Sequence, residues 1–363
     1  MASGVGTRIA DLDTPALVVD IEAMERNIAR ISSCLRDAGK AWRPHTKGIK
    51  VPAIAHRMIR SGAIGITCAK VSEAEVMVAA GIDNILIANQ VVGTTKLQRL
   101  AALRRSANVM VAVDSVQNVQ QIGAVASEWG QTVGALVEVN VGLERCGVAP
   151  GEPALQLARA IQETNGVTFE GVMAWEGHTQ TISGVAAKER AIAESVGALT
   201  MTAERCRSAG LPVRVVSCGG SGTYRITARQ PGVTEIQAGG GVFGDVFYND
   251  AGAEVEFALT VHATVTSRPA ADRIVADSGK KSMSGDTALP RPLGLRGVKK
   301  VRLAAEHATI ELEESNEQLR VGDRIVFLVG YEDTTVCLHD VLYGVRGGLV
   351  EAVWPILGRG KLQ

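Results

Sequence analysis

Short apolar runs alternate with helical patterns over the first two-thirds of the chain. In the helical segments, apolar residues recur three and four positions apart, as on the buried face of a helix. Glycine, a preferred residue just past a helix C-terminus, follows five of these segments, at Gly39, Gly62, Gly81, Gly130 and Gly210. The predicted helices cover residues 21–38, 51–60, 72–80, 96–105, 116–128, 153–164 and 185–208. The intervening runs predict strands at 17–20, 42–46, 64–69, 85–89, 109–113, 136–141, 169–174, 213–217 and 234–238.

Repeated strand–helix units predict a parallel sheet. Counting from residue 42 gives eight strands, which favours an α/β fold of the (β/α)8 TIM-type barrel class, with the strand at 17–20 left over. An open, doubly wound sheet is the alternative. Beyond about residue 250, β-branched and alternating runs replace the helical patterns, at 255–267, 273–276, 301–303, 309–312, 324–329 and 336–342. They predict a second, all-β domain at the C-terminal end.

Composition narrows the class of protein. Lys plus Arg and Asp plus Glu both total 38, so charge gives no reason to expect binding to nucleic acid or to a membrane. No apolar run reaches the roughly 18 residues that a membrane span needs, and the first residues lack the pattern of a signal peptide. The six cysteines are scattered without a CxxC pair, which favours the reducing cytoplasm over a disulfide framework or a zinc ribbon.

Two glycine-rich turns follow the last two predicted barrel strands: CGGSGT at 218–223 and AGGG at 238–241. Active sites of such barrels lie at the carboxyl ends of the strands, and the loops after strands 7 and 8 often hold a phosphate there. Glycine lets backbone N–H groups approach an anion closely. Neither turn matches GxGxxG or a Walker loop, which disfavours a dinucleotide or ATP. The alternative for each turn is a tight bend without a ligand.

The stretch RPHTK, residues 43–47, places a lysine at the end of the first barrel strand. A lysine beside a phosphate site indicates pyridoxal 5'-phosphate, because its aldehyde forms a Schiff base with an amine. Lys47 is therefore the candidate cofactor-binding residue. Lys50 is its rival, although we expect it to lie in the turn toward the next helix. The alternative for Lys47 is a solvated loop lysine.

Six segments carry a family resemblance: RPHTK, VSEAEVMVAAGIDNILIANQVVG, VEVNVGLERCG, WEGHTQ, SCGGSGT and PGVTEIQAGGGVFGD. In this order, over nearly the whole chain, they resemble the D-threonine aldolase/D-serine dehydratase family. Its members are fold-type III pyridoxal-phosphate enzymes, usually homodimers, with an alanine racemase-like barrel and a C-terminal β domain. The resemblance implies an N-terminal strand within residues 1–20 that packs with the β domain, a cofactor-binding barrel at 21–249 and the β domain at 250–363.

The resemblance also implies roles for individual residues. Lys47 would bond to the cofactor, and Arg145 of the VGLERCG motif would lie near the phenolic oxygen of the cofactor. Trp175 would lie beside the ring, where relatives commonly have tyrosine. His178 would act on the substrate side or support the site, and a structural histidine is the alternative. The residues implied to hold the phosphate are Ser221, Gly222, Thr223, Gly239 and Gly240.

One segment departs from the family pattern: GYEDTTVCLHD, residues 330–340. Relatives hold a divalent metal (manganese, magnesium or zinc) there through His-x-Asp or His-x-Cys. Asp333 stands at the second ligand position, but Tyr331 replaces the histidine. A neutral phenol is a poor ligand beside an imidazole. Three possibilities stay open: weak metal binding through Asp333, recruitment of another ligand, or no metal.

The expected activity is that of a lyase for a small molecule, a D-β-hydroxy-α-amino acid. The first prediction is retro-aldol cleavage to glycine and an aldehyde, with Tyr331 or Asp333 managing the β-hydroxyl. The alternatives are an ammonia-lyase (dehydratase) and a racemase or epimerase that uses Lys47 and Tyr331 as its two bases. A cofactor-handling protein of this fold lacks the large β domain, so residues 250–363 favour an enzyme. Arg346, Lys280 and Lys281 would either read a second substrate carboxylate or lie in solvent.

Overall fold

The computed structural model describes residues 4–315 and 317–363. The chain forms two compact units, and neither of them is continuous in sequence. The barrel unit contains Ile31–Lys47, Ile54–Gly239 and Lys361–Gln363. The β unit contains the residues up to Arg30, Gly48–Ala53 and Gly240–Gly360.

The core of the barrel unit is an eight-stranded parallel sheet in the order β2-β9-β8-β7-β6-β5-β4-β3. Beyond β2, a parallel bridge joins His45 to Thr67 of β3, and Thr46 N–H donates to the Thr67 carbonyl oxygen at 2.8 Å. These bonds connect the two ends of the sheet, so the predicted barrel fold is confirmed. The strands are β2 (Ala41–Trp42), β3 (Ile66–Cys68), β4 (Asn84–Ile87), β5 (Asn108–Val113), β6 (Val133–Glu138), β7 (Val167–Met173), β8 (Val215–Cys218) and β9 (Glu235–Ile236).

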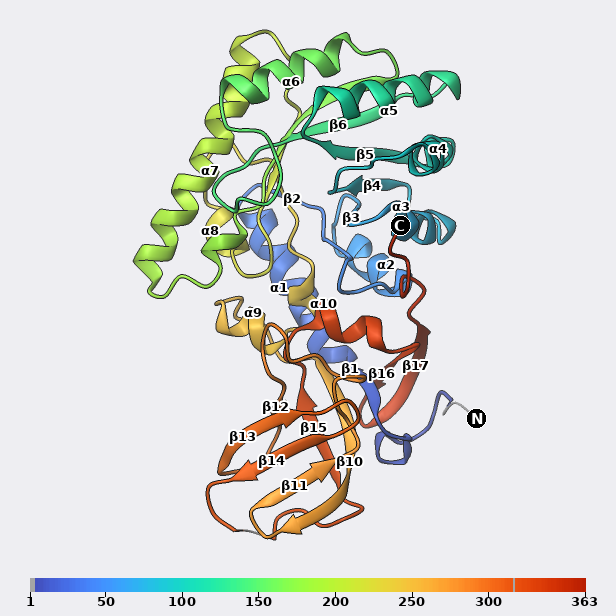
Figure 1. Ribbon diagram of the computed structural model, residues 1–363, viewed down its shortest axis with the longest axis vertical. Coiled ribbons are helices and arrows are strands. Elements are labelled where there is room, and N and C mark those ends of the chain that lie inside the picture. Colours follow the sequence, from blue (N-terminus) through green and yellow to red (C-terminus); the bar gives the residue numbers. More distant parts are fainter. Residues whose placement is uncertain (1–3, 316) are drawn as a thin grey trace. The chain divides into compact units, whose positions relative to one another are not determined.

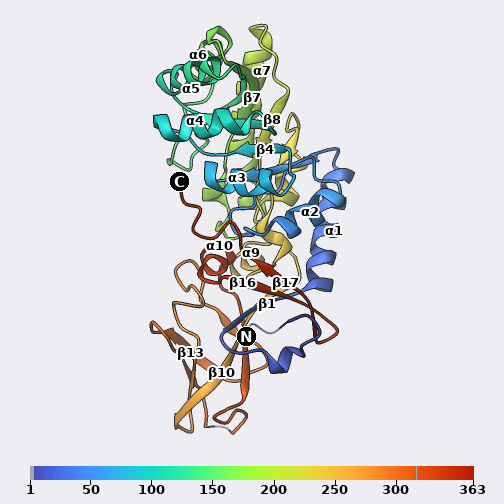
Figure 2. The same ribbon diagram turned by 90° about the vertical axis from the view of Figure 1, so that its right-hand side faces the viewer.

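Helices α3 to α7 lie outside these strands, as Figure 1 shows for α4, α5 and α6, and Figure 2 shows α3, α4 and α5 side by side. The five predicted capping glycines all have positive φ, between 63° and 103°, a conformation that favours glycine over any other residue. The helices are α1 (Ile21–Asp37), α2 (Pro52–Arg60), α3 (Val71–Ala79), α4 (Thr94–Leu103), α5 (Val116–Glu128), α6 (Glu152–Glu163), α7 (Val185–Ser208) and α8 (Tyr224–Thr227). None of the described helices has the length and apolar character needed to cross a lipid bilayer.

The β unit is built on a mostly antiparallel sheet in the order β13-β14-β11-β10-β1-β16-β17, with β15 pairing with both β10 and β12. The N-terminal strand β1 lies inside this sheet, antiparallel to β10 and parallel to β16. The strands are β1 (Ala16–Asp20), β10 (Leu259–Ala270), β11 (Arg273–Ala276), β12 (Arg291–Pro292), β13 (Val298–Leu303), β14 (Ala308–Leu312), β15 (Arg324–Leu328), β16 (Val341–Arg346) and β17 (Leu349–Pro355).

The strand predicted at 336–342 is wrong over most of its length. The chain forms the short helix α10 (Glu332–Thr335) and a 3-10 turn at Val336–Leu338, and β16 begins only at Val341. The buried residues Glu332, Thr335 and Val336 show the reason, since they are spaced three and four apart, as on one helix face. Strands β12 and β17 and the short helix α9 (Val246–Asp250) were not predicted.

Acid is expected to weaken the β unit through His262 on β10. Burial, together with the Arg324 guanidinium, lowers the pKa of His262 to about 4. Below the ordinary histidine pKa of about 6.5, His262 binds a proton in the unfolded chain but stays neutral in the folded chain. The free energy of unfolding should therefore fall by about 3 kcal/mol between pH 6.5 and 4. Urea unfolding of wild type and His262→Gln across this range checks the expectation. If both proteins lose the same stability, His262 is not the cause.

Candidate functional site

Lys47 follows β2 at the carboxyl end of the barrel strands. Its backbone N–H donates to His45 Nδ1 at 3.2 Å, so the turn after β2 is held locally. Lys47 is half-buried, whereas Lys50 lies beyond the turn, with a φ of 56°. The position of Lys50 agrees with the expectation that it belongs to the connection toward α2.

The arginine of RPHTK has a structural partner. The guanidinium of Arg43 donates through Nε to both carboxylate oxygens of Glu235 on β9, at 3.0 and 3.1 Å. Its Nη1 also donates to Asn84 Oδ1 at 2.9 Å. Both charged side chains are nearly inaccessible, at 4% and 3% exposure. This buried ion pair ties β2 to β9 and explains why a barrel strand carries an arginine.

A buried carboxylate organises the glycine-rich loop after β8. Glu176 Oε2 accepts from Gly219 N–H at 3.2 Å, and Oε1 accepts from the hydroxyls of Thr223 at 2.9 Å and Thr227 at 2.6 Å. Sequence reasoning assigned no role to Glu176. The available signal was an acidic residue shortly after a buried strand, within the WEGH motif.

The same loop leaves backbone donors that a phosphate would use. Ser221 and Gly222 are buried, as is Gly239 in the loop after β9, the strand beside β8. Among the residues that the structure describes, the backbone N–H groups of Gly222 and Gly239 donate no hydrogen bond. Buried N–H groups without a partner call for a ligand or water. These donors fit the phosphate of pyridoxal phosphate. Thr223 differs, since its N–H donates to the Gly220 carbonyl oxygen at 3.0 Å and its hydroxyl to Glu176.

Trp175 and Arg145 lie together in the barrel unit. Both line one small cavity, with Glu138 and Asn140 among the other lining residues. Trp175 packs closely on the loop after β8, because a Cβ atom placed on Gly220 would overlap its ring. Ring and guanidinium are therefore close enough to serve one bound molecule.

The buried carboxylate of Glu138 anchors the loop that carries Arg145. It accepts from Gln90 Nε2 at 2.6 Å and from Cys146 Sγ at 3.1 Å, and Arg145 Nη2 lies 3.7 Å from its Oε1. Arg145 itself is 57% exposed. Glu138 is a second residue that sequence reasoning missed. It ends β6, but its partners lie up to 48 positions away and only the fold brings them together.

His178 is exposed and lies in a 3-10 turn at Gly177–Thr179. Its Nε2 is 3.3 Å from Ser195 Oγ. A Cβ atom on Gly142 would come within 3.0 Å of the same ring nitrogen, so the VGLERCG loop packs on the histidine. The structure therefore places His178 against the segment that carries Arg145.

Tyr331 and Asp333 form a hydrogen-bonded pair in the β unit. The Tyr331 hydroxyl donates to Asp333 Oδ2 at 2.5 Å. Burial, reinforced by the Glu332 carboxylate, raises the pKa of Tyr331 to about 12. The phenol therefore stays protonated at neutral pH. Gly48, the residue after Lys47, belongs to this unit, and its main chain lies directly against the Asp333 carboxylate.

Aromatic rings and further carboxylates surround this pair. Phe247 meets Tyr331 edge to face at a centroid distance of 5.2 Å, and Tyr248 does so at 5.8 Å. The carboxylates of Asp245 and Glu332 are both fully buried, and burial together with Glu332 raises the pKa of Tyr248 well above its usual value. Gly240 lies here too, since a Cβ atom on it would overlap Glu332 Oε1. The surroundings of Tyr331 are thus apolar and anionic.

The donor set at Tyr331 and Asp333 does not fit a resident divalent metal. One oxygen of Asp333 accepts from Tyr331, and the phenol keeps its proton. In the described part of the chain, no group of three or more His, Cys, Asp and Glu side chains is arranged to hold a metal ion. The nearby His339 is also occupied, because its Nε2 lies 2.7 Å from the carbonyl oxygen of Ser282.

The basic residues that were candidates for binding a second substrate carboxylate have other surroundings. Arg346 pairs with Glu22, Glu25 and Glu351, and Lys281 pairs with Glu306. Lys280 is exposed. Arg346 and Lys281 therefore already have carboxylate partners within the protein.

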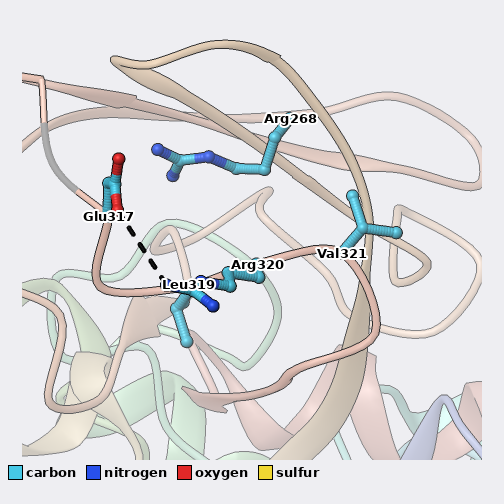
Figure 3. Close-up of a pocket in the computed structure, with 5 residues that line it drawn as sticks. All are labelled: Arg268, Glu317, Leu319, Arg320 and Val321. Carbon is cyan, nitrogen blue, oxygen red and sulfur yellow. Dashed lines mark ion pairs between the residues drawn. The ribbon is translucent and has the colours of Figure 1, made fainter.

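A separate cavity of about 310 Å³ lies in the β unit, lined by Arg268, Glu317, Leu319, Arg320 and Val321. Figure 3 shows the ion pair between Glu317 and Arg320, whose charged atoms are 4.0 Å apart, and Arg268 extending toward Glu317 in this view. Glu317 and Arg320 are both highly exposed. None of the predicted site residues lines this cavity, so we assign it no part in the chemistry.

Comparison with known proteins finds matches along both parts of the chain. A family model described as the alanine racemase N-terminal domain matches residues 19–246, and one for a serine dehydratase domain matches residues 258–345. A D-threonine aldolase of Arthrobacter sp is 35% identical over 359 residues, which cover 98% of this chain and 95% of that protein.

Two solved structures are also similar. The D-threonine aldolase from Filomicrobium marinum has a TM-score of 0.97 and 35% identity, with full coverage of both chains. The D-threo-3-hydroxyaspartate dehydratase from Delftia sp. HT23 has a TM-score of 0.89 and 28% identity, covering 96% of this chain and 99% of that one.

Proposed function

Because the chain belongs to the alanine racemase-like family that includes D-threonine aldolase and D-threo-3-hydroxyaspartate dehydratase, we propose that it is a pyridoxal-phosphate lyase. Its reaction is retro-aldol cleavage of a D-β-hydroxy-α-amino acid to glycine and an aldehyde. The observation that carries the choice of reaction is the Tyr331–Asp333 pair, which supplies a carboxylate proton acceptor where relatives of this family are expected to hold a metal.

The barrel unit would bind the cofactor. Lys47 would hold its aldehyde covalently, and Arg145 and Trp175 would contact its ring. Ser221, Gly222 and Gly239 would hold the phosphate, and Thr223 would shape the loop, because both of its donors are already used. When bound, the cofactor accepts the electron pair released as the Cα–Cβ bond breaks. His178 would support the loop of Arg145 through Gly142.

Asp333 would take the proton of the substrate β-hydroxyl. A general base must be ionised and within hydrogen-bond reach of the proton that it removes. The Tyr331 hydroxyl orients one carboxylate oxygen of Asp333. Tyr331 cannot easily be that base, because its pKa of about 12 keeps the phenol protonated. The same fact disfavours Tyr331 as the second base of a racemase, since in one direction of that reaction it would have to remove the Cα proton.

The pair also favours cleavage over dehydration. In dehydration the β-hydroxyl leaves, and a metal acting as a Lewis acid would assist its departure. In retro-aldol cleavage the hydroxyl only loses its proton, which a carboxylate can accept. A site that supplies Asp333, and whose described donor set does not fit a metal, therefore suits the second reaction.

The surroundings of Asp333 indicate a neutral substrate side chain. Asp245, Glu332 and Asp333 place three carboxylates near the phenol of Tyr331. A second substrate carboxylate would be repelled, and Arg346 and Lys281 are already paired. We therefore propose D-threonine or a related neutral amino acid rather than 3-hydroxy-D-aspartate.

The direct test is an assay of the full-length protein loaded with cofactor. With D-threonine and a strong chelator, we expect stoichiometric glycine and acetaldehyde, and a much lower kcat/KM for 3-hydroxy-D-aspartate. Keto acid and L-threonine are measured in the same samples. Glycine that forms only after manganese is added would contradict the metal-free assignment. Keto acid, or L-threonine without glycine, would overturn the aldolase reaction itself.

Replacing Asp333 by asparagine is expected to lower kcat by about 10²- to 10⁴-fold, because an amide cannot accept the hydroxyl proton. Tyr331→Phe should lower kcat about tenfold, because one charge-assisted hydrogen bond to Asp333 is lost. The matched control is Asp340→Asn, which removes a carboxylate that is 82% exposed and paired with Arg359, and it should stay within about twofold of wild type. Equal glycine formation by Asp333→Asn and wild type would exclude Asp333 as the base.

We further propose that the enzyme works as a cytoplasmic homodimer. None of the six cysteines, all of which lie among the described residues, forms a disulfide bond, as expected for a reducing compartment, and the dimer follows from the family resemblance. Light scattering of the purified protein at micromolar concentration would give twice the mass of 38.1 kDa if the dimer forms.

A further inference from the structure

We infer that Glu176 is a positioning residue for the cofactor phosphate. It would not touch the cofactor but would set the shape of the loop that does. This inference rests on the proposed function, because it assumes a phosphorylated cofactor in the loop after β8.

The carboxylate of Glu176 holds both ends of that loop. Gly219, where the loop begins, donates its N–H to Oε2, and Thr223, where it ends, donates its hydroxyl to Oε1. Thr227 in α8 donates to the same Oε1. Glu176 is 1% exposed, so these contacts are made away from solvent. One side chain from the end of β7 thus fixes the path of residues 219–223.

The contacts also decide which donors remain for a ligand. The Gly219 N–H and the Thr223 hydroxyl are taken by Glu176, and the Gly220 N–H is taken by Thr223 Oγ1 at 3.1 Å. The Gly222 N–H is left without a partner among the described residues, at the turn between the two anchored ends. Glu176 therefore presents the middle of the loop to an anion by occupying the donors at its ends.

Stability alone does not explain a carboxylate at this position. No Lys or Arg side chain forms an ion pair with Glu176 in the described chain, and burying a charge with only neutral donors around it is costly. However, only a carboxylate accepts at both oxygens. A glutamine would place an amide donor against either the Gly219 N–H or the two threonine hydroxyls.

Charge and position make opposite predictions for Glu176→Gln. Removing a negative charge close to a phosphate site would, by Coulomb's law, strengthen phosphate binding. Displacing the loop would weaken it. A loss of affinity confined to phosphorylated ligands therefore identifies positioning and cannot arise from the charge change.

The experiment compares the binding of pyridoxal phosphate and pyridoxal to the full-length protein freed of cofactor. For Glu176→Gln we expect about tenfold weaker binding of pyridoxal phosphate and pyridoxal binding within about twofold of wild type. Thr223→Val removes the contact from the loop side and leaves the buried charge in place. It should likewise weaken the binding of pyridoxal phosphate relative to the binding of pyridoxal. It also keeps the test available if Glu176→Gln does not fold. Thr227 contacts Glu176 but lies outside the loop, so Thr227→Val should leave the relative affinities for the two ligands unchanged.

Two results would overturn the inference. If both ligands lose affinity by the same factor, Glu176 acts on the fold as a whole. If pyridoxal phosphate binds Glu176→Gln as tightly as it binds wild type, or more tightly, the loop does not depend on Glu176. A wild-type protein that binds pyridoxal as tightly as pyridoxal phosphate would instead refute the phosphate site, and with it the proposed function.

Discussion

Lys47→Met is expected to abolish covalent attachment of the cofactor and to lower kcat/KM for D-threonine by about 10³-fold or more. The amine is both the point of attachment and a group able to move protons at Cα, and proton transfer alone contributes about 10²- to 10⁴-fold. Methionine keeps the length of the side chain without the amine. Borohydride reduction followed by peptide mass spectrometry measures attachment, and a glycine assay measures turnover.

Lys50→Met is the matched control for this change. Lys50 lies three residues further on, is buried and has a left-handed backbone conformation, so its environment is at least as demanding. Attachment and turnover should persist in this variant. Attachment that survives in Lys47→Met and disappears in Lys50→Met would reverse the assignment of the two lysines.

The second large effect is on stability: Glu235→Ala should lower the free energy of unfolding by about 3–5 kcal/mol. The change leaves the guanidinium of Arg43 buried without its carboxylate, inside the connection between β2 and β9. Removing one partner of a buried pair is more harmful than removing both. Denaturant unfolding monitored by circular dichroism gives the difference.

The control is a similar ion pair at the surface. Arg214 and Glu170 also connect neighbouring barrel strands, β8 and β7, but Arg214 is 57% exposed. Arg214→Ala should cost no more than about 1 kcal/mol. The double variant Arg43→Met/Glu235→Leu should recover most of the lost stability, because no unpaired charge is left. If the single and double variants are equally destabilised, the loss comes from packing rather than from the unpaired charge.

The sequence predicts local elements well wherever periodicity and caps agree. The helices at 116–128 and 185–208 match α5 and α7 at both ends, and both are followed by a glycine with positive φ. The error at 336–342 has the opposite origin. There the β-branched and alternating pattern at 336–342 indicated a strand, whereas the burial of Glu332, Thr335 and Val336 follows a helical turn.

The site residues that belong to sequence motifs were predictable. The hydrogen bonds and ion pairs between residues far apart in the sequence were not. The lysine and the glycine-rich turns are visible along the chain. Glu176 meets Gly219, Thr223 and Thr227 across 43 to 51 positions, and Arg43 meets Glu235 across 192. Such contacts depend on which strands become neighbours. Periodicity within one segment carries no information about that.

The position of β1 has a consequence for synthesis of the protein. Its apolar residues Leu17, Val18 and Val19 leave the ribosome early, yet all three pair with β10. Val18 and Val19 also pair with β16, which follows more than 300 positions later. At about 5–20 residues per second, the strand waits on the order of 15–60 s for its last neighbour. During that time its backbone N–H and C=O groups lack a strand partner on that side and can pair with other chains. Production at low temperature with abundant chaperones, or a circular permutant that begins after β1 and carries it at the C-terminus, should therefore raise the yield of correctly folded enzyme.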